Sequence, residues 1–212
     1  RAVQSREPAG LAEAVALTLM GVRLGNWPTE RRDNMAVFFS RVAFKPTDEW
    51  KEEIVHSDPA ATDALDAVFP DGTAAVIEPS GDPRVSFADW LITADNPWFG
   101  RNIVNRLWAW LMGRGIIHEP DDIRPTNPPV NPELLSYLEK ELVNAEYDLR
   151  HLFRLILNSR TYQQSPIARN DHPEAETMFA CYLIRRLDAE VLIDALDWVG
   201  GTKRNYESRI PE

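Results

Sequence analysis

The 212-residue sequence contains a single cysteine, Cys181. One cysteine excludes an internal disulfide, a zinc site built from several cysteines and a Cys-x-x-Cys-His haem attachment within this chain. Its surroundings, Met178-Phe-Ala-Cys-Tyr-Leu-Ile, predict a buried small hydrophobic side chain on a helix over about 174–186. We therefore expect this chain to hold no cofactor.

Long hydrophobic runs are also missing. No apolar stretch approaches the roughly 20 residues that span a bilayer, and no signal peptide is present. The first residue is Arg1 rather than a methionine, and no element follows Gly201 to close the fold. We therefore expect a fragment of a longer protein, truncated at its C-terminus, with no membrane span in the fragment.

Positive charge is scarce. Lys and Arg number 23 against 33 Asp and Glu, which gives a net charge of −10. Ten of the acids lie between Lys45 and Asp82, against two lysines. Nucleic acids require clustered Lys and Arg, so we expect no nucleic-acid partner. The acidic segment is more typical of a solvated surface, although a surface that docks a partner protein remains an alternative.

Common catalytic and metal-binding motifs are absent. The sequence has no Gly-x-Ser-x-Gly, no P-loop, no Gly-x-Gly-x-x-Gly and no His-Glu-x-x-His. His118-Glu-Pro-Asp-Asp offers possible ligands, but its carboxylates lack the spacing of a calcium loop. The sequence therefore predicts neither catalytic residues nor a metal site.

What is present is helical periodicity, bounded by clear capping residues. Asp82-Pro83, Asn96-Pro97 and Asn131-Pro132 each place a capping side chain before a proline, and Asp148 and Asp188 can cap two further helices. These signals predict an all-α fold, an irregular bundle of roughly eight helices with a small acidic loop or hairpin excursion over 45–81. Within that excursion, the alternation around Trp50 and 74–77 suggests short strands, and 60–68 suggests a helical turn.

The best candidate site lies on the helix expected over 97–112. Its apolar stripe, from Phe99 through Ile103 and Leu107 to Trp110, leaves a second face that carries arginine, asparagine and tryptophan. Arginine binds carboxylate or phosphate, and tryptophan stacks on flat apolar surfaces, so this face suits an anionic or sugar ligand. The candidate ligand-binding residues are Arg101, Asn105, Arg106, Trp108, Asp121 and Asp122. In the alternative that we favour, the arginines pair with acids such as Asp89, Asp95, Asp121 or Asp122 and tie the helix to its loops.

Several polar and aromatic strings resemble a known family. They are Asp82-Pro-Arg, Arg101…Asn105-Arg-Leu-Trp, Gly113-Arg-Gly-Ile-Ile, Asp121-Asp-Ile-Arg, Pro132-Glu-Leu-Leu, Ser159-Arg-Thr-Tyr-Gln and Arg186-Leu-Asp-Ala-Glu. In this order they resemble the planctomycete-type domain of unknown function numbered 1553, over about 82–200. Residues 17–44 are similar to the end of the domain numbered 1549. We accordingly expect three segments: 1–44 from the 1549-type domain, an acidic linker over 45–81, and the 1553-type domain over 82–212.

The resemblance also implies a setting. Many relatives carry a haem-binding Cys-x-x-Cys-His between a Gly-Val-Arg and a Phe-Phe-x-Arg-Val string, but here Gly21-Val-Arg and Phe38-Phe-Ser-Arg-Val enclose no cysteine. It implies a periplasmic or extracellular location, and as partners other domains of the same polypeptide, a cytochrome c-like module or a glycan. We expect a non-catalytic binding or scaffold module of a larger exported bacterial protein. The alternative is a hydrolase-like enzyme that acts on anionic glycans in an Arg/Asn/Asp-lined cleft.

Overall fold

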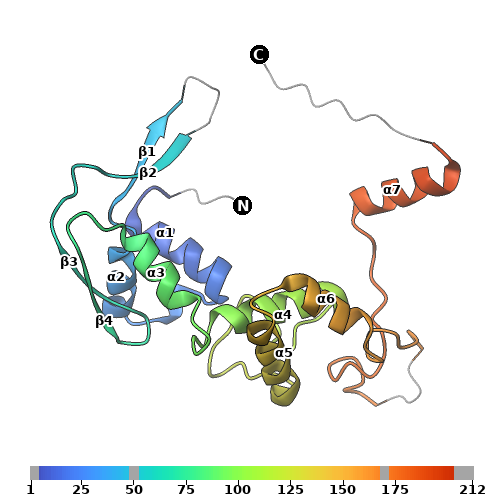
Figure 1. Ribbon diagram of the computed structural model, residues 1–212. Coiled ribbons are helices and arrows are strands. Elements are labelled where there is room, and N and C mark those ends of the chain that lie inside the picture. The colour runs from blue at the N-terminus through green and yellow to red at the C-terminus, as the bar shows by residue number, and fades with distance from the viewer. Residues whose placement is uncertain (1–4, 48–52, 168–171, 203–212) are drawn as a thin grey trace. The chain divides into compact units, whose positions relative to one another are not determined.

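The computed structural model of the chain describes residues 5–47, 53–167 and 172–202 (Figure 1). The chain divides into two compact units, Arg1–Tyr182 and Leu183–Glu212. Part of the acidic segment, residues 48–52 with Trp50, lies outside the described residues. None of the helices in the described ranges combines the length and hydrophobicity needed to cross a bilayer.

Helices and strands follow one another in three groups along the first unit. The first group is α1 (Pro8–Val15), the π-helical turn η1 (Ala16–Met20), the 3-10 turn η2 (Leu24–Asn26) and α2 (Thr29–Val37). The second group is β1 (Val42–Pro46), β2 (Glu53–Ser57), β3 (Leu65–Val68) and β4 (Ala74–Ile77). The third group is α3 (Pro83–Leu91), α4 (Phe99–Met112), α5 (Pro132–Asn144) and α6 (Leu149–Leu157). The second unit contributes α7 (Ala189–Gly200).

The fold is mixed α/β, so the expectation of an all-α bundle of roughly eight helices is wrong. The described residues form seven α-helices and two antiparallel sheets of two strands each. In the first sheet Val42 of β1 pairs with Ser57 of β2, and in the second Leu65 of β3 pairs with Ile77 of β4. The strand expected over 74–77 is confirmed as β4. The helical turn expected over 60–68 is wrong, because residues 65–68 form β3.

The β3–β4 hairpin forms because residues 69–73 contain strong turn chemistry. Gly72 adopts a left-handed conformation with φ of 93°, which glycine tolerates without steric cost. The carboxylate of Asp71 accepts a hydrogen bond from the Thr73 amide at 2.8 Å, as in an Asx-turn. The Phe69 amide closes the turn by donating to the Thr73 carbonyl at 2.8 Å. This tight turn overrides any helical tendency of the short flanking runs.

Arg41 anchors the strand region to the start of α3. The whole residue is 4% exposed, although arginine is rarely buried. Its guanidinium donates to the backbone carbonyls of Asp63, Pro79 and Gly81, which come from two loops. Charged donors satisfied by several carbonyls form strong hydrogen bonds, so one buried side chain fixes both ends of the second hairpin.

Capping predictions are confirmed for several helices. The side chains of Asp82, Asn131 and Asp148 accept hydrogen bonds from backbone amides two or three residues later, at 2.8–2.9 Å. The cap expected at Asn96-Pro97 is displaced, because α4 begins at Phe99 with Trp98 as its N-cap. The Asn96 side chain still accepts from the amides of Trp98 and Phe99, at 3.0 and 3.2 Å. Gly113, with φ of 84°, ends α4 in the left-handed conformation typical of a helix C-terminus.

The helix expected over 174–186 is not formed. Residues 173–179 make turns, and residues 182–188 are irregular. Phe179 adopts a positive φ of 53°, and the Ala180 amide donates to the Ala175 carbonyl at 2.8 Å, which closes a turn instead of continuing a helix. Phe179 thereby places its ring in the core, and Cys181 is buried as expected. Asp188 does precede α7, but its side chain makes no capping hydrogen bond within the described residues.

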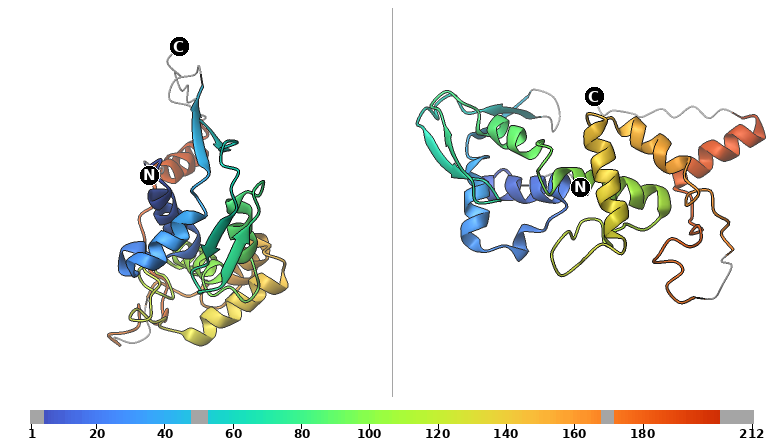
Figure 2. Two further views of the ribbon diagram at one scale, coloured as in Figure 1. Left: turned by 90° about the vertical axis from the view of Figure 1, so that its left-hand side faces the viewer. Right: turned by 60° about the horizontal axis from the view of Figure 1, so that its bottom comes forward.

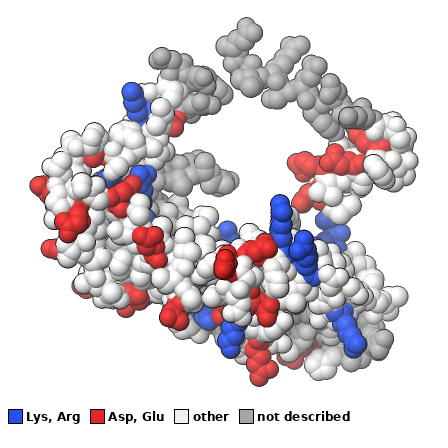
Figure 3. Space-filling model, viewed as in Figure 1, with Lys and Arg blue, Asp and Glu red and all other residues white. Residues whose placement is uncertain are grey.

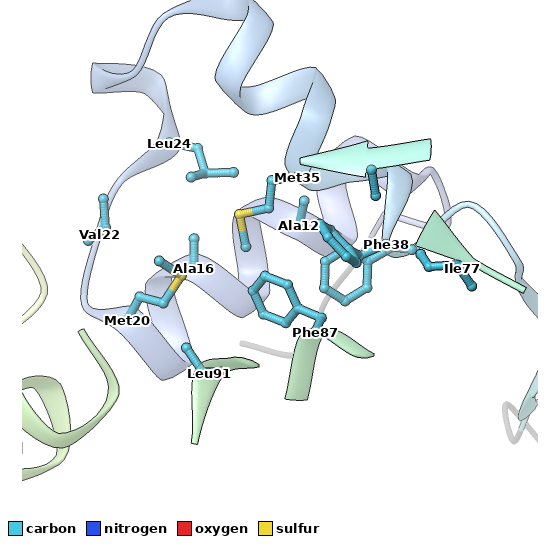
Figure 4. Close-up of a cluster of buried hydrophobic side chains, with 12 residues drawn as sticks. Ala12, Ala16, Met20, Val22, Leu24, Met35, Phe38, Ile77, Phe87 and Leu91 are labelled. Atoms are coloured by element: carbon cyan, nitrogen blue, oxygen red, sulfur yellow. The ribbon is translucent and has the colours of Figure 1, made fainter. Parts of the chain in front are cut away.

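Two clusters of buried apolar side chains hold the first unit together. The first joins α1, η1, α2 and the β3–β4 hairpin to α3, and Figure 4 shows the rings of Phe38 and Phe87 next to each other within it. Their ring centroids are 5.3 Å apart. The second cluster joins α4, α5 and α6, which pack together in Figure 2. Burying each large apolar side chain stabilises the fold by about 1.5–3 kcal/mol.

Candidate functional site

The candidate site is centred on α4, a helix with neighbours on several sides. It packs against η1, α5 and α6. Side chains around much of its circumference are therefore buried, including Asn102, Asn105 and Trp108, which are at most 2% exposed. Trp110, expected in the core, is 68% exposed instead. The expected division into one core stripe and one open polar face is therefore wrong.

Asn105 lies in the core and binds the loop that follows α4. Its side-chain amide donates to the Ile117 carbonyl at 2.9 Å, and its side-chain oxygen accepts from the Ile117 amide at 2.8 Å. Both residues are almost completely buried. Each polar group of the pair thus satisfies the other, and the asparagine replaces the partner that a neighbouring strand would supply.

Arg106 ties α4 to two distant segments. One terminal nitrogen donates to the Leu17 carbonyl at 2.8 Å and lies 2.6 Å from a carboxylate oxygen of Asp121. This confirms the expected pairing of Arg106 with a loop acid. The ion pair is partly exposed on both sides, so most of its contribution to stability comes from the hydrogen bond to the less accessible backbone.

The remaining predicted residues have separate partners. Arg101 pairs with Glu139 of α5 at 2.7 Å, rather than with any of the acids proposed for it. Asp122 accepts from the Arg124 side chain at 2.9 Å, and so holds its own loop. Trp108 packs edge-on against Phe179 with ring centroids 5.2 Å apart. The structure therefore brings Arg106 and Asp121 together. Arg101 has a different partner, Glu139, and Trp108 is buried.

Asn102 is a residue that the sequence reasoning missed. Its amide donates to the Thr18 carbonyl at 2.9 Å, which joins α4 to η1. Gly21, with φ of 66°, ends η1 beside it, and a β-carbon there would come within 2.6 Å of the Asn102 side-chain oxygen. The Gly21 carbonyl in turn accepts from the Ile123 amide at 2.9 Å. Gly21 is the first residue of the Gly-Val-Arg string. This glycine was the one sequence signal that could have pointed to a close contact here.

The charged side chains around α4 do not gather into a patch of one sign. In the view of Figure 3, acidic and basic side chains are both scattered over the visible surface. Within the described ranges, no three of His, Cys, Asp and Glu come close enough to hold a metal ion. The arrangement can hold segments together through the hydrogen bonds of Asn102, Asn105 and Arg106. Among the described residues, Asn102 Oδ1, Arg106 Nε and Trp108 Nε1 are buried without a hydrogen-bond partner.

A comparison with protein-family models matches residues 83–209 to PSD1, described as a protein of unknown function (DUF1553). No curated protein matches the chain, and no solved structure matches it either.

Proposed function

Since the chain belongs to the PSD1 family of proteins of unknown function, we propose that it is a non-catalytic scaffold module whose helix α4 holds distant segments in place. One observation carries the proposal: three polar side chains of α4 donate to backbone carbonyls of other segments. Asn102 binds the backbone of Thr18, Asn105 that of Ile117, and Arg106 that of Leu17.

Engaged groups make poor catalysts or ligand-binding groups. To contact a substrate, Asn105 would first have to give up two buried hydrogen bonds to Ile117. Leaving buried backbone groups unpaired costs about 1–3 kcal/mol each. An active site instead needs groups that are fixed in place yet keep an open donor or acceptor for the reacting molecule. The hydrogen bonds of α4 favour a structural role over the hydrolase-like alternative.

The setting of the module is also part of the proposal. The resemblance of the strings between residues 82 and 200 to domains of large exported proteins supports a periplasmic or extracellular location. The partners would be other domains of the same polypeptide, among them a 1549-type domain and a cytochrome c-like module. In that setting the chain would be a structural support for the neighbouring domains.

The test compares stability with ligand binding. Arg106→Met removes the hydrogen bond to Leu17 and the ion pair to Asp121, so we expect it to lower the free energy of unfolding by about 1–2 kcal/mol. The matched control is Arg150→Met, an exposed arginine on α6, with a change within about 0.5 kcal/mol. Urea unfolding of the full chain measures both.

The opposite pattern would support an enzyme or a glycan-binding cleft. The same proteins are heated with heparin and with chondroitin sulfate, two anionic glycans. If the module is a scaffold, we expect any rise in unfolding temperature with either glycan to be the same in the wild type and in Arg106→Met. If Arg106→Met leaves stability unchanged and abolishes a glycan-induced rise seen in the wild type, the scaffold role is wrong.

A further inference from the structure

A second polar site lies away from α4, where α2 meets the turn of the β3–β4 hairpin. Figure 1 shows these elements side by side, and the Arg31 side chain of α2 donates to the Pro70 carbonyl of the turn at 2.8 Å. An open pocket of about 470 Å³ lies between them, within the ~300–1,000 Å³ range of small-ligand sites. Its polar lining consists of Glu30, Arg31, Asn34 and Asp71.

The guanidinium of Arg31 is held in place from two directions. It stacks on the indole of Trp27, 3.8 Å from the ring centroid, and its Nε atom makes the hydrogen bond to Pro70. Its two terminal nitrogens have no hydrogen-bond partner within the described part of the chain, although Arg31 lines the pocket. The stacking and the hydrogen bond from Nε hold the guanidinium in place, so its two terminal nitrogens form a preorganised pair of donors.

The carboxylate of Asp71 is fixed in a similar way on the turn. One oxygen accepts from the Thr73 amide and the other from the Trp90 indole, both at 2.8 Å. Burial raises the pKa of Asp71, but these hydrogen bonds outweigh it and hold the pKa below its ordinary value. Each carboxylate oxygen retains a lone pair for a further donor.

Arg31 and Asp71 face the same pocket without contacting each other. They form no ion pair in the described part of the chain, yet the charge of Asp71 acts on Arg31: burial lowers the Arg31 pKa, and Asp71 partly offsets this. A fixed donor pair and a fixed acceptor are therefore presented to the same space. This differs from Asn105 of α4, whose side-chain donor and acceptor are both paired with the backbone of Ile117.

The mixture of charges selects the class of ligand. A carboxylate or phosphate would suit Arg31 but would be repelled by Glu30 and Asp71, and an amine would suit the two carboxylates but would be repelled by Arg31. A hydroxyl group can accept from Arg31 and donate to a carboxylate at the same time. Asn34 adds a side-chain amide that can both donate and accept. Val68, Pro70 and the edge of Phe69, whose ring stacks on both Phe38 and Trp90, supply an apolar wall.

We propose that this pocket binds a neutral saccharide unit, with neighbouring hydroxyls bridging Arg31, Asn34 and Asp71 and the ring resting against the apolar wall. The site is independent of the scaffold role of α4, so either proposal can fail without affecting the other. The pocket residues also precede residue 83, so the site lies outside the part of the chain that matches the family.

The test uses simple pyranose sugars that are neutral, anionic or cationic. The probes are methyl glucoside, methyl galactoside and methyl mannoside, with glucuronate and glucosamine as the anionic and cationic comparisons. The indole N–H of Trp90 donates to Asp71, so its NMR resonance reports on the pocket. We expect at least one neutral glycoside to shift this resonance saturably in the full chain, and the charged sugars to bind at least tenfold more weakly.

Substitutions then assign the binding to the pocket. Asn34→Ala on α2 should weaken binding by about tenfold, the equivalent of roughly 1.4 kcal/mol. Asp33→Ala, an exposed neighbour that does not line the pocket, is the matched control and should bind like the wild type. Arg31→Lys keeps the charge but loses the fork, and should weaken binding by a similar factor. If Arg31→Lys unfolds, Asn34→Ala decides alone.

Three results would overturn the proposal. The first is no shift of the Trp90 resonance with any neutral glycoside at 100 mM, on the order of a hundred times the ~1 mM affinity scale of weak complexes. The second is tighter binding of glucuronate or glucosamine than of every neutral sugar. The third is saturable binding that Asn34→Ala does not weaken.

Discussion

The substitution Asn105→Ala tests the role of α4 most directly. Asn105 is fully buried, and its side chain pairs with both backbone groups of Ile117, which is 2% exposed. Alanine removes both hydrogen bonds without offering replacements. Water cannot reach the site without opening the second apolar cluster, so the amide and carbonyl of Ile117 would remain unpaired.

The expected loss follows from these two orphaned groups. Each unsatisfied buried donor or acceptor costs about 1–3 kcal/mol, so we expect a loss of about 2–6 kcal/mol in the free energy of unfolding. That is a large fraction of the ~5–15 kcal/mol typical of a folded domain. For a protein of this size, each kcal/mol lost lowers the unfolding temperature by about 2–4 °C, so the expected drop is roughly 4–24 °C.

Thermal and urea unfolding followed by circular dichroism measure this loss. Asn144→Ala, at the exposed C-terminal end of α5, is the matched control and should change stability by less than about 0.5 kcal/mol. Asn105→Asp keeps the shape but sets an acceptor against the Ile117 carbonyl, and should be at least as destabilising as alanine. A loss below about 1 kcal/mol for Asn105→Ala would refute the reasoning, because the loop would then be held by other contacts.

Two further predictions concern other parts of the first unit. Gly21→Ala should cost about 2 kcal/mol or more in urea unfolding, because left-handed φ is strained for alanine and the β-carbon would meet Asn102; Gly25→Ala, with no atom within 4 Å, should change little. The hydrogen bond from Arg84 lowers the pKa of Asp82 below 3.8, so its stabilising effect is present above about pH 4 and is lost as the pH falls further. Asp82→Asn should therefore flatten the fall in unfolding free energy below pH 4, and an unchanged slope would contradict this assignment.

Local signals in the sequence predicted much of the secondary structure. The caps at Asp82, Asn131 and Asp148 were predictable because a side chain bonds an amide only two or three residues away. The strand over 74–77 was predicted from the short apolar run Ala74-Ala-Val-Ile. The Pro70-Asp-Gly turn was equally local, and reading it as a hairpin signal would have replaced the helical turn expected over 60–68 with a strand.

The environment of α4 was not predictable in the same way. Helical periodicity shows which residues share a face, but not how many faces have neighbours. Trp110 fits the apolar stripe and is exposed, whereas Asn105 departs from it and is buried. The pairing of Arg101 with Glu139 depends on how α5 packs against α4, which no short-range pattern encodes. The pairing of Arg106 with Asp121 was foreseen only as one of several options.

The two polar clusters suggest how structural and binding roles can be told apart in a fold of unknown function. Around α4, Asn105 and its backbone partner satisfy each other, and replacing either should change stability first. In the α2 pocket, Arg31 is held by a stack and one hydrogen bond, and its remaining donors face an open space lined by Asp71. Groups that are fixed in place yet incompletely paired cost stability to maintain and gain it back only when a ligand completes them. Asn34→Ala should therefore affect saccharide binding and leave unfolding nearly unchanged, whereas Asn105→Ala should do the reverse.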